Sequence, residues 1–195
     1  MTNLEKELEF SILLDEMKRI LRRTKHIGHD IYENDAEHSF HISVMAMVFH
    51  SYCKEETDLS HTIKMLLVHD LVEIYAGDTF CYDVEANGDK FERESAAADK
   101  LFGMLPVEKG EMFHNLWKEF EEGKTPESKF ANAMDRVQPL LNNLENDGGT
   151  WRNDSVKYTD VVKRMKPVAE FSQEIWAHLD VKVREAFKKM GKDLE

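Results

Sequence analysis

The sequence has few cysteines and no long apolar run. Its two cysteines, Cys53 and Cys81, are far apart and form no CxxC motif. No apolar stretch approaches the ~18 residues that a membrane-spanning helix needs, and the N-terminus lacks a cationic region followed by a signal-type apolar segment. A reduced, cytoplasmic setting is therefore expected, without membrane insertion.

Basic residues are also in short supply, because 26 Lys and Arg face 38 Asp and Glu and give a net charge of −12. Such a surface repels nucleic-acid polymers and anionic lipids at long range, so neither is expected as a partner. An anionic small-molecule substrate would need a local positive site. The length of 195 residues, without repeats or low-complexity linkers, fits one domain over residues 1–195 with a C-terminal helical extension.

Apolar residues recur at helical spacing along most of the chain, and strand-like alternation is scarce. Three signals mark helix N-termini. They are a capping-box pair formed by Asn34 and Glu37, a capping residue at Asp58, and a capping Thr125 that is followed by Pro126. Turn-forming residues predict a loop over 78–90 and a break over 146–149, and Pro167 should kink or split the last helix. The sequence predicts an all-α bundle of about seven helices, over residues 4–24, 36–55, 60–76, 90–104, 106–122, 126–145 and 159–188.

The stretch KMLLVHDLVEIYAGD, residues 64–78, carries His69 and Asp70 directly after four apolar residues. Adjacent side chains on a helix diverge by about 100° and can approach one point from two sides, which suits a metal better than a proton relay. Two ligands alone would bind weakly, and His38 and Asp135 are the natural additions from other predicted helices. Taken singly, His38 could be a cap neighbour and Asp135 the partner of Arg136; their combination favours a metal site.

Several segments together resemble the HD superfamily of metal-dependent phosphohydrolases, in the branch of the 5′-deoxynucleotidases. They are ENDAEHSFH (33–41), KMLLVHDLVEIYAGDTF (64–80), ERESAAADKLFGMLP (92–106), TPESKFANAMDRVQPLL (125–141) and GGTWR (148–152). The resemblance implies an HD-domain helical bundle, a homodimer, and four metal ligands, His38, His69, Asp70 and Asp135.

The same resemblance implies that Glu73 and Asp78 are catalytic or supporting acids. Glu73 also lies four residues after His69, one turn along the same helix face. For the phosphate, the resemblance points to an arginine near the end of the first predicted helix, and Arg23 is the preferred candidate over Arg22. Here Arg23 is followed by Thr24, whereas characterised deoxynucleotidases have an Arg-Trp pair whose ring helps exclude a ribose 2′-hydroxyl. A deoxyribose preference therefore does not follow from this pair.

The predicted function is a metal-dependent 5′-nucleotidase that releases phosphate from (deoxy)nucleoside 5′-monophosphates through a metal-activated water. Mixed nitrogen and oxygen ligands suit one divalent transition metal, which could be Mn²⁺, Co²⁺, Fe²⁺, Zn²⁺ or Ni²⁺. Asp78 or Glu73 would orient the water or protonate the leaving 5′-oxygen.

Two alternatives stay open. One is an HD phosphohydrolase acting on another nucleotide or phosphoester, such as a nucleoside triphosphate, an alarmone or a cyclic dinucleotide, although the GYP motif of the last class is absent. A dinuclear HD oxygenase would need further histidines. The other is a non-catalytic metal- or nucleotide-binding sensor, against which the intact Glu73 and Asp78 argue.

Overall fold

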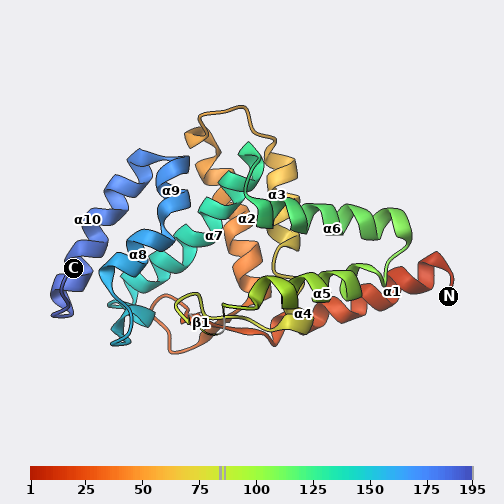
Figure 1. Ribbon diagram of the computed structural model, residues 1–195, viewed down its shortest axis with the longest axis horizontal. Coiled ribbons are helices and arrows are strands. Elements are labelled where there is room, and N and C mark those ends of the chain that lie inside the picture. The colour runs from red at the N-terminus through yellow and green to blue at the C-terminus, as the bar shows by residue number, and fades with distance from the viewer. Residues whose placement is uncertain (84, 86, 195) are drawn as a thin grey trace.

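A computed structural model describes residues 1–83, 85 and 87–194, and helices dominate it (Figure 1). The α-helices are α1 (Asn3–Leu13), α2 (Asp35–Phe49), α3 (Leu59–Val68), α4 (Glu73–Ala76), α5 (Lys90–Phe102), α6 (Val107–Glu122), α7 (Pro126–Glu145), α8 (Tyr158–Arg164), α9 (Lys166–Phe171) and α10 (Gln173–Lys189). Among these described elements, α1, α2, α3, α5, α6, α7 and α10 have ten residues or more. The predicted all-α bundle of about seven helices is confirmed.

The helix starts follow the local sequence signals. The side chains of Asn34, Asp58 and Thr125 each accept a hydrogen bond from a backbone N–H in the first turn of α2, α3 and α7. Pro126 occupies the first turn of α7, where its missing N–H costs nothing. Gly77, with φ of +75°, ends α4 in a conformation that disfavours a side chain. The three N-terminal caps confirm the predicted starts of α2, α3 and α7.

The expected first helix over 4–24 is wrong beyond Leu13. After a 3₁₀ turn at Leu14–Lys18 the chain becomes strand β1 (Leu21–Lys25), which pairs antiparallel with β2 (Tyr32–Asn34). Strand geometry places alternate side chains on one face, and here Arg22 and Thr24 turn toward buried acids while Arg23 stays exposed. Contacts with acids that are distant in sequence therefore favour a strand here, although the apolar periodicity predicts a helix.

Three other expected helices are shorter than predicted. The segment 60–76 breaks after Val68 into the tight turn 69–72, where the N–H of Glu73 bonds the carbonyl of Asp70 at 3.0 Å, before α4 begins. The segment 36–55 leaves α-helix at Phe49 for a 3₁₀ turn at His50–Tyr52. The last segment is divided into three helices rather than two, with Pro167 in the first turn of α9 and an extended Ser172 before α10.

Helix α7 is the centre of the bundle, since it contacts α2, α3, α6 and α9 (Figure 1). Its residues Phe130, Met134 and Leu140 are at most 1% exposed, so this helix is buried on several sides. The arm formed by α1, α5 and α6 reaches toward the N-terminal end, and α8–α10 cover the opposite end (Figure 1). Within the described residues, no helix combines the length and the apolar character needed to cross a bilayer.

Candidate metal centre

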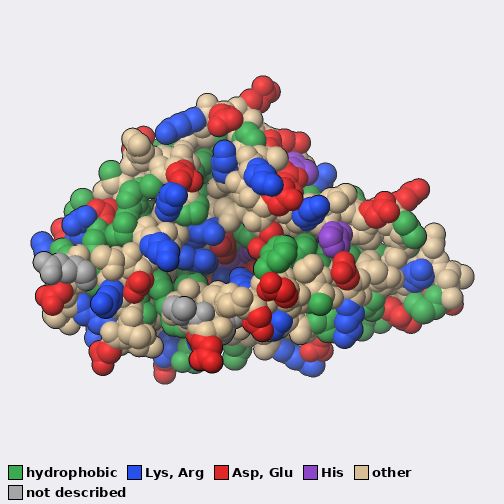
Figure 2. Space-filling model, in the orientation of Figure 1, with side chains coloured by type: hydrophobic (Ala, Val, Ile, Leu, Met, Phe, Trp, Pro, Cys, Tyr) green, Lys and Arg blue, Asp and Glu red, His purple; other side chains and the backbone are tan. Residues whose placement is uncertain are grey.

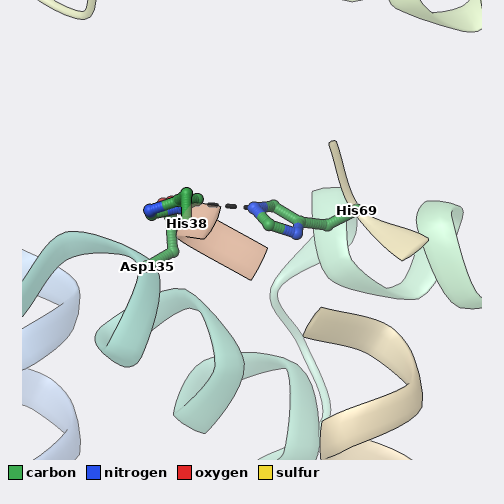
Figure 3. A group of neighbouring side chains, drawn as sticks. All are labelled: His38, His69 and Asp135. Atoms are coloured by element: carbon green, nitrogen blue, oxygen red, sulfur yellow. Dashed lines mark hydrogen bonds and ion pairs between the residues drawn. The ribbon is translucent and has the colours of Figure 1, made fainter. Parts of the chain in front are cut away.

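Three buried side chains from three helices converge on one point (Figure 3). His38 lies in the first turns of α2, His69 caps the C-terminal end of α3, and Asp135 projects from the middle of α7. One ligand atom from each lies within 4.8 Å of the others. The break after Val68 matters here because it directs the end of α3 toward α7.

Hydrogen bonds on the far side of each imidazole fix its tautomer. The Nδ1 of His38 is 3.0 Å from the Gln138 amide oxygen, and the Nδ1 of His69 is 2.8 Å from the Leu66 carbonyl oxygen. Since these oxygens only accept, each Nδ1 carries the hydrogen and each Nε2 can present a lone pair. The two Nε2 atoms lie 3.2 Å and 3.7 Å from Oδ1 of Asp135.

The residues fit a metal ion. Within the described residues, the buried Nε2 of His69 has no hydrogen-bond partner. Oδ2 of Asp70 is only 3.1 Å from this nitrogen, but the angle between the two groups does not suit a hydrogen bond. An orphaned buried atom of this kind calls for an explanation, and two imidazole nitrogens beside a carboxylate oxygen are a donor set that divalent transition metals accept. The structure therefore holds a potential His/Asp metal site.

The charge balance of the site agrees with this assignment. Burial lowers the pKa of His69, but the carboxylates of Asp70 and Asp135 outweigh burial and raise that pKa to about 10. A ring that faces two carboxylates thus needs a positive charge beside it, either a proton on Nε2 or a cation in its place.

Asp70, the fourth predicted ligand, lies at the edge of the group. Its Oδ2 accepts a hydrogen bond of 2.7 Å from Nη1 of Arg22 and is 3.8 Å from Nε2 of His38. Although burial opposes ionisation, His69 and Arg22 hold the pKa of Asp70 below its usual range. Asp70 is therefore an anion in reach of the centre and already paired with Arg22, and its ligation stays a prediction.

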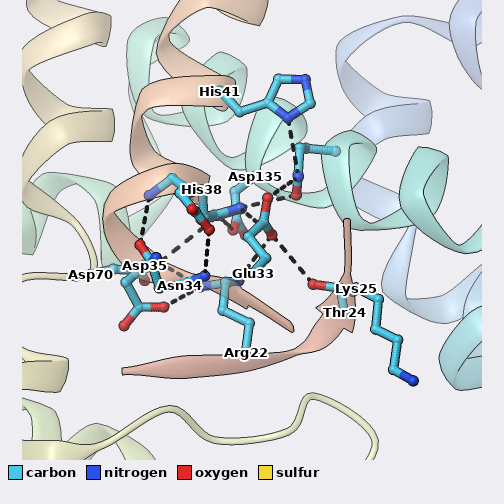
Figure 4. A network of polar contacts seen from close by, with 12 residues as sticks. Arg22, Thr24, Lys25, Glu33, Asn34, Asp35, His38, His41, Asp70 and Asp135 are labelled. Carbon is cyan, nitrogen blue, oxygen red and sulfur yellow. Dashed lines mark hydrogen bonds and ion pairs between the residues drawn. The ribbon is translucent and has the colours of Figure 1, made fainter. Parts of the chain in front are cut away.

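A second layer of polar residues surrounds the centre (Figure 4). Arg22 Nη1 also donates to Oδ1 of Asp35 at 3.1 Å. Gln138 donates from Nε2 to Glu33 at 2.6 Å, while its oxygen accepts from His38. Oε2 of Glu33 in turn accepts from the Thr24 hydroxyl at 3.3 Å. These bonds connect β1, β2, α2 and α7, and through Gln138 they orient the imidazole of His38.

The two predicted acids lie beside this centre. Glu73 is 4% exposed, and its Oε2 has no hydrogen-bond partner among the described residues. Burial, with the negative charges of Asp70 and Asp35, raises the pKa of Glu73 well above its ordinary value. Burial likewise raises the pKa of Asp78, which follows the turn at Gly77. Glu73 therefore holds a proton more readily than an ordinary glutamate.

A cavity of about 290 Å³ opens onto the centre and includes His69, Asp70 and Asp135 in its lining. Figure 2 shows basic and acidic side chains meeting in a hollow near the middle of this face. The lining contains both predicted acids, Glu73 and Asp78, and five cationic side chains, Arg22, Arg23, Lys90, Arg136 and Arg164. The lining also includes Glu94 and Glu121, so an anionic substrate would find local cations beside acidic side chains.

The predicted phosphate contact, Arg23, is exposed and lines this cavity, so its position is compatible with the prediction. Arg22, which was less favoured, is the less exposed of the two, with 13% of its side chain exposed, and it pairs with Asp70 and Asp35. Both lie on β1 rather than at the end of a helix. Thr24 is 8% exposed and bonded to Glu33, so the residue that follows Arg23 contributes no aromatic ring.

Sequence reasoning missed Gln138, Glu33 and Asp35. Gln138 gave a weak signal, since it is a polar residue three positions after Asp135 within an apolar helix segment. Glu33 and Asp35 flank the capping residue Asn34, and solvated acids at a helix start are so common that nothing marked them as buried.

The fold and the His/Asp centre define an HD domain. The family model described as HD domain matches residues 14–176, and the chain belongs to this family. It is similar to the crystal structure of a protein from Magnetospirillum magnetotacticum MS-1 named "Predicted metal-dependent phosphohydrolase", with 40% identity, coverage of 96% of this chain and 94% of that one, and a TM-score of 0.90.

Curated relatives point to a narrower group within the family. The chain is 31% identical over 140 residues to the 5′-deoxynucleotidase HDDC2 of Xenopus laevis, covering 71% of this chain and 68% of the relative. It is 30% identical over 147 residues to the protein of the same name from Dictyostelium discoideum, covering 71% and 76%. The resemblance predicted from the sequence motifs is confirmed.

Proposed function

We propose that this chain is a metal-dependent phosphohydrolase that releases phosphate from nucleoside 5′-monophosphates. The observation that carries the proposal is the convergence of two Nε2 atoms and one Asp135 oxygen beside a cavity whose lining includes five cationic side chains. The relatives named 5′-deoxynucleotidases support the nucleotide as substrate.

His38, His69, Asp135 and Asp70 would hold one divalent transition metal, with Mn²⁺, Co²⁺, Fe²⁺, Zn²⁺ and Ni²⁺ all compatible with the donor set. When bound, such an ion supplies Lewis-acid chemistry and a water of lowered pKa. Arg23, exposed at the cavity, binds the phosphate of the incoming substrate. The cavity volume of about 290 Å³ suits a mononucleotide-sized ligand.

Glu73 and Asp78 carry the proton transfers. Glu73, whose pKa is raised by burial, holds the proton that the leaving 5′-oxygen needs. Asp78 orients the attacking water from the end of the α4 turn. The two roles follow from the difference in burial, since Glu73 is buried and Asp78 only half-buried.

Sugar selection is proposed to be relaxed. The Thr24 hydroxyl is already bonded to Glu33, and the side chain places no ring next to Arg23. A ribose 2′-hydroxyl would therefore meet less steric exclusion than beside the tryptophan of the Arg-Trp pair. Ribonucleotides are expected as substrates together with deoxyribonucleotides.

The test measures phosphate release from matched 5′-deoxyribonucleotides and 5′-ribonucleotides with added Mn²⁺ or Co²⁺. Asp70→Ala should abolish release, whereas Asp99→Ala, whose side chain is 75% exposed on α5, should not. Absence of release by the wild-type chain with any of the five metals would contradict the proposal. Nucleotide binding without release would instead favour a sensor.

We also propose a homodimer, a C-terminal helical extension and a cytoplasmic location. A homodimer is supported by apolar side chains exposed along one helix, since Phe40, Val44, Met47 and Val48 of α2 are 42–69% exposed. A C-terminal helical extension is supported by the end of the family match at residue 176. A cytoplasmic location follows from the sequence pattern alone.

A further inference from the structure

We propose that Arg136 and Arg164 form an anion subsite on the Asp135 side of the centre, where they bind non-bridging oxygens of the phosphoryl group under attack. This inference rests on the proposed function and adds residues that neither the motifs nor the resemblance assigned.

The two oxygens of Asp135 face different groups. Oδ1 faces the two imidazoles, at 3.2 Å and 3.7 Å. Oδ2 faces Nη1 of Arg136 at 3.5 Å and Nη2 of Arg164 at 3.8 Å. Both distances to the arginines exceed those of ordinary N–H···O hydrogen bonds. Asp135 therefore attracts the two guanidinium groups without using up their donors.

Arg136 is held in place by its own helix. Its Nη1 donates to the carbonyl oxygen and to the side-chain oxygen of Asn132, each at 2.7 Å. Its side chain is 17% exposed and lines the cavity. A guanidinium fixed by one nitrogen still presents its other N–H groups in a rigid plane, which matches the oxygens of a phosphate.

Arg164 is the freer partner. It ends α8, its side chain is 35% exposed, and it also lines the cavity. Within the described part of the chain it makes no hydrogen bond beyond its ion pair with Asp135. A guanidinium on a cavity wall with unused donors is available to a ligand.

The local charge also indicates an anion. Two guanidinium groups share one carboxylate oxygen, and the other oxygen of that carboxylate faces the potential metal site. Like charges this close repel each other, and burial increases that cost. A phosphate dianion placed between them would offset the repulsion through charge-assisted hydrogen bonds.

The position favours the reacting phosphoryl group over a remote one. The arginines lie within 4 Å of the carboxylate whose other oxygen contacts the imidazoles, so a group bound by them would lie next to the centre. Arg23 lines the same cavity from β1. Donors on two sides of one phosphoryl group can stabilise the charge that develops on its oxygens.

The test uses inorganic phosphate as the probe, both in direct titration and as an inhibitor of nucleotide hydrolysis by the Mn²⁺-loaded protein. Arg164→Gln should raise the phosphate dissociation constant about tenfold or more, as expected for a lost charge-assisted hydrogen bond, and Arg164→Lys should restore part of it. Lys163→Gln removes the same charge from the exposed neighbouring position and should change phosphate binding less than twofold.

The Co²⁺ affinity of the variant shows whether Arg164 binds phosphate directly or acts on phosphate binding through the metal centre. Arg164→Gln should bind Co²⁺ within about twofold of the wild-type chain, because the hydrogen bonds that orient the imidazoles are untouched. Loss of Co²⁺ and phosphate affinity by the same factor, or unchanged phosphate binding, would overturn the subsite. If the wild-type chain hydrolyses no nucleotide, the proposed function fails, yet the phosphate titration still decides whether the subsite exists.

Discussion

Gln138 connects the imidazole of His38 to Glu33, and replacing it with leucine is the sharpest test of how the centre is held. The side chain accepts from His38 Nδ1 at 3.0 Å and donates to Glu33 at 2.6 Å, and it is fully buried. Gln138→Leu introduces an apolar side chain of similar size and removes the partners of His38 Nδ1 and of Glu33 Oε1, while Glu33 Oε2 keeps its bond to Thr24. Neither partner has water to turn to, because both are buried.

The magnitude follows from two separate losses. Each buried group left without a partner costs about 1–3 kcal/mol, so the free energy of unfolding should fall by about 2–6 kcal/mol. The His38 ring also loses the bond that fixes its tautomer, and loss of such an outer partner typically lowers metal affinity about 10–100-fold. The first effect concerns the whole fold and the second the centre alone.

Two measurements separate these effects. Urea unfolding in the presence of a chelator gives the stability change, and competition between the folded protein and a chelator gives the Co²⁺ affinity. Leu179→Ala, in the buried face of α10, is the control, since it should cost about 2–5 kcal/mol without changing Co²⁺ affinity. Co²⁺ affinity of Gln138→Leu within twofold of the wild-type value would refute the reasoning.

Two further predictions concern charge in the buried network. Burial raises the pKa of Glu94 to about 7 despite Lys90. Between the ordinary glutamate pKa of 4.5 and pH 7 the folded state therefore binds more protons than the unfolded state, and stability falls as pH rises through that window. Glu94→Gln should therefore remove about 3 kcal/mol of the stability difference between pH 5 and pH 8 in urea unfolding, and the exposed Glu92→Gln should not. Arg22→Met leaves Asp70 and Asp35 without their cation, which should destabilise the metal-free protein by about 3–5 kcal/mol; added Mn²⁺ should recover part of that loss, and unfolding curves that do not respond to Mn²⁺ would contradict this account.

The parts of the fold that local chemistry determines could be predicted from the sequence. Asn34, Asp58 and Thr125 cap the helices they were expected to cap, because a side chain that satisfies a backbone N–H acts over three residues. The strand at Leu21–Lys25 could not be predicted in this way. Its conformation depends on Arg22 reaching Asp70, which lies 48 residues away.

The same distinction applies to the centre. His69 and Asp135 were predicted because their residue types are costly in apolar helices, and His38 because a metal needs further ligands; the structure brings the three together. The use of Gln138 to orient His38 was not predicted, since it spans 100 residues of sequence and glutamine is common in solvated helix faces. The ion pair between Arg22 and Asp70 was not predicted, because the strand alternation that separates Arg22 from Arg23 was not recognised.

The three converging side chains come from α2, α3 and α7, and His38 and Asp135 are 97 residues apart in sequence. A cation bound among them would connect parts of the chain that are far apart in sequence. A partly unfolded chain would not hold the three ligands together and so could not bind the cation in this way. By thermodynamic linkage, ion binding would then stabilise the native state as a whole, by about 2.7 kcal/mol at an ion concentration a hundredfold above the dissociation constant. The melting temperature of this protein would therefore report how much of it is loaded with metal, whatever the substrate.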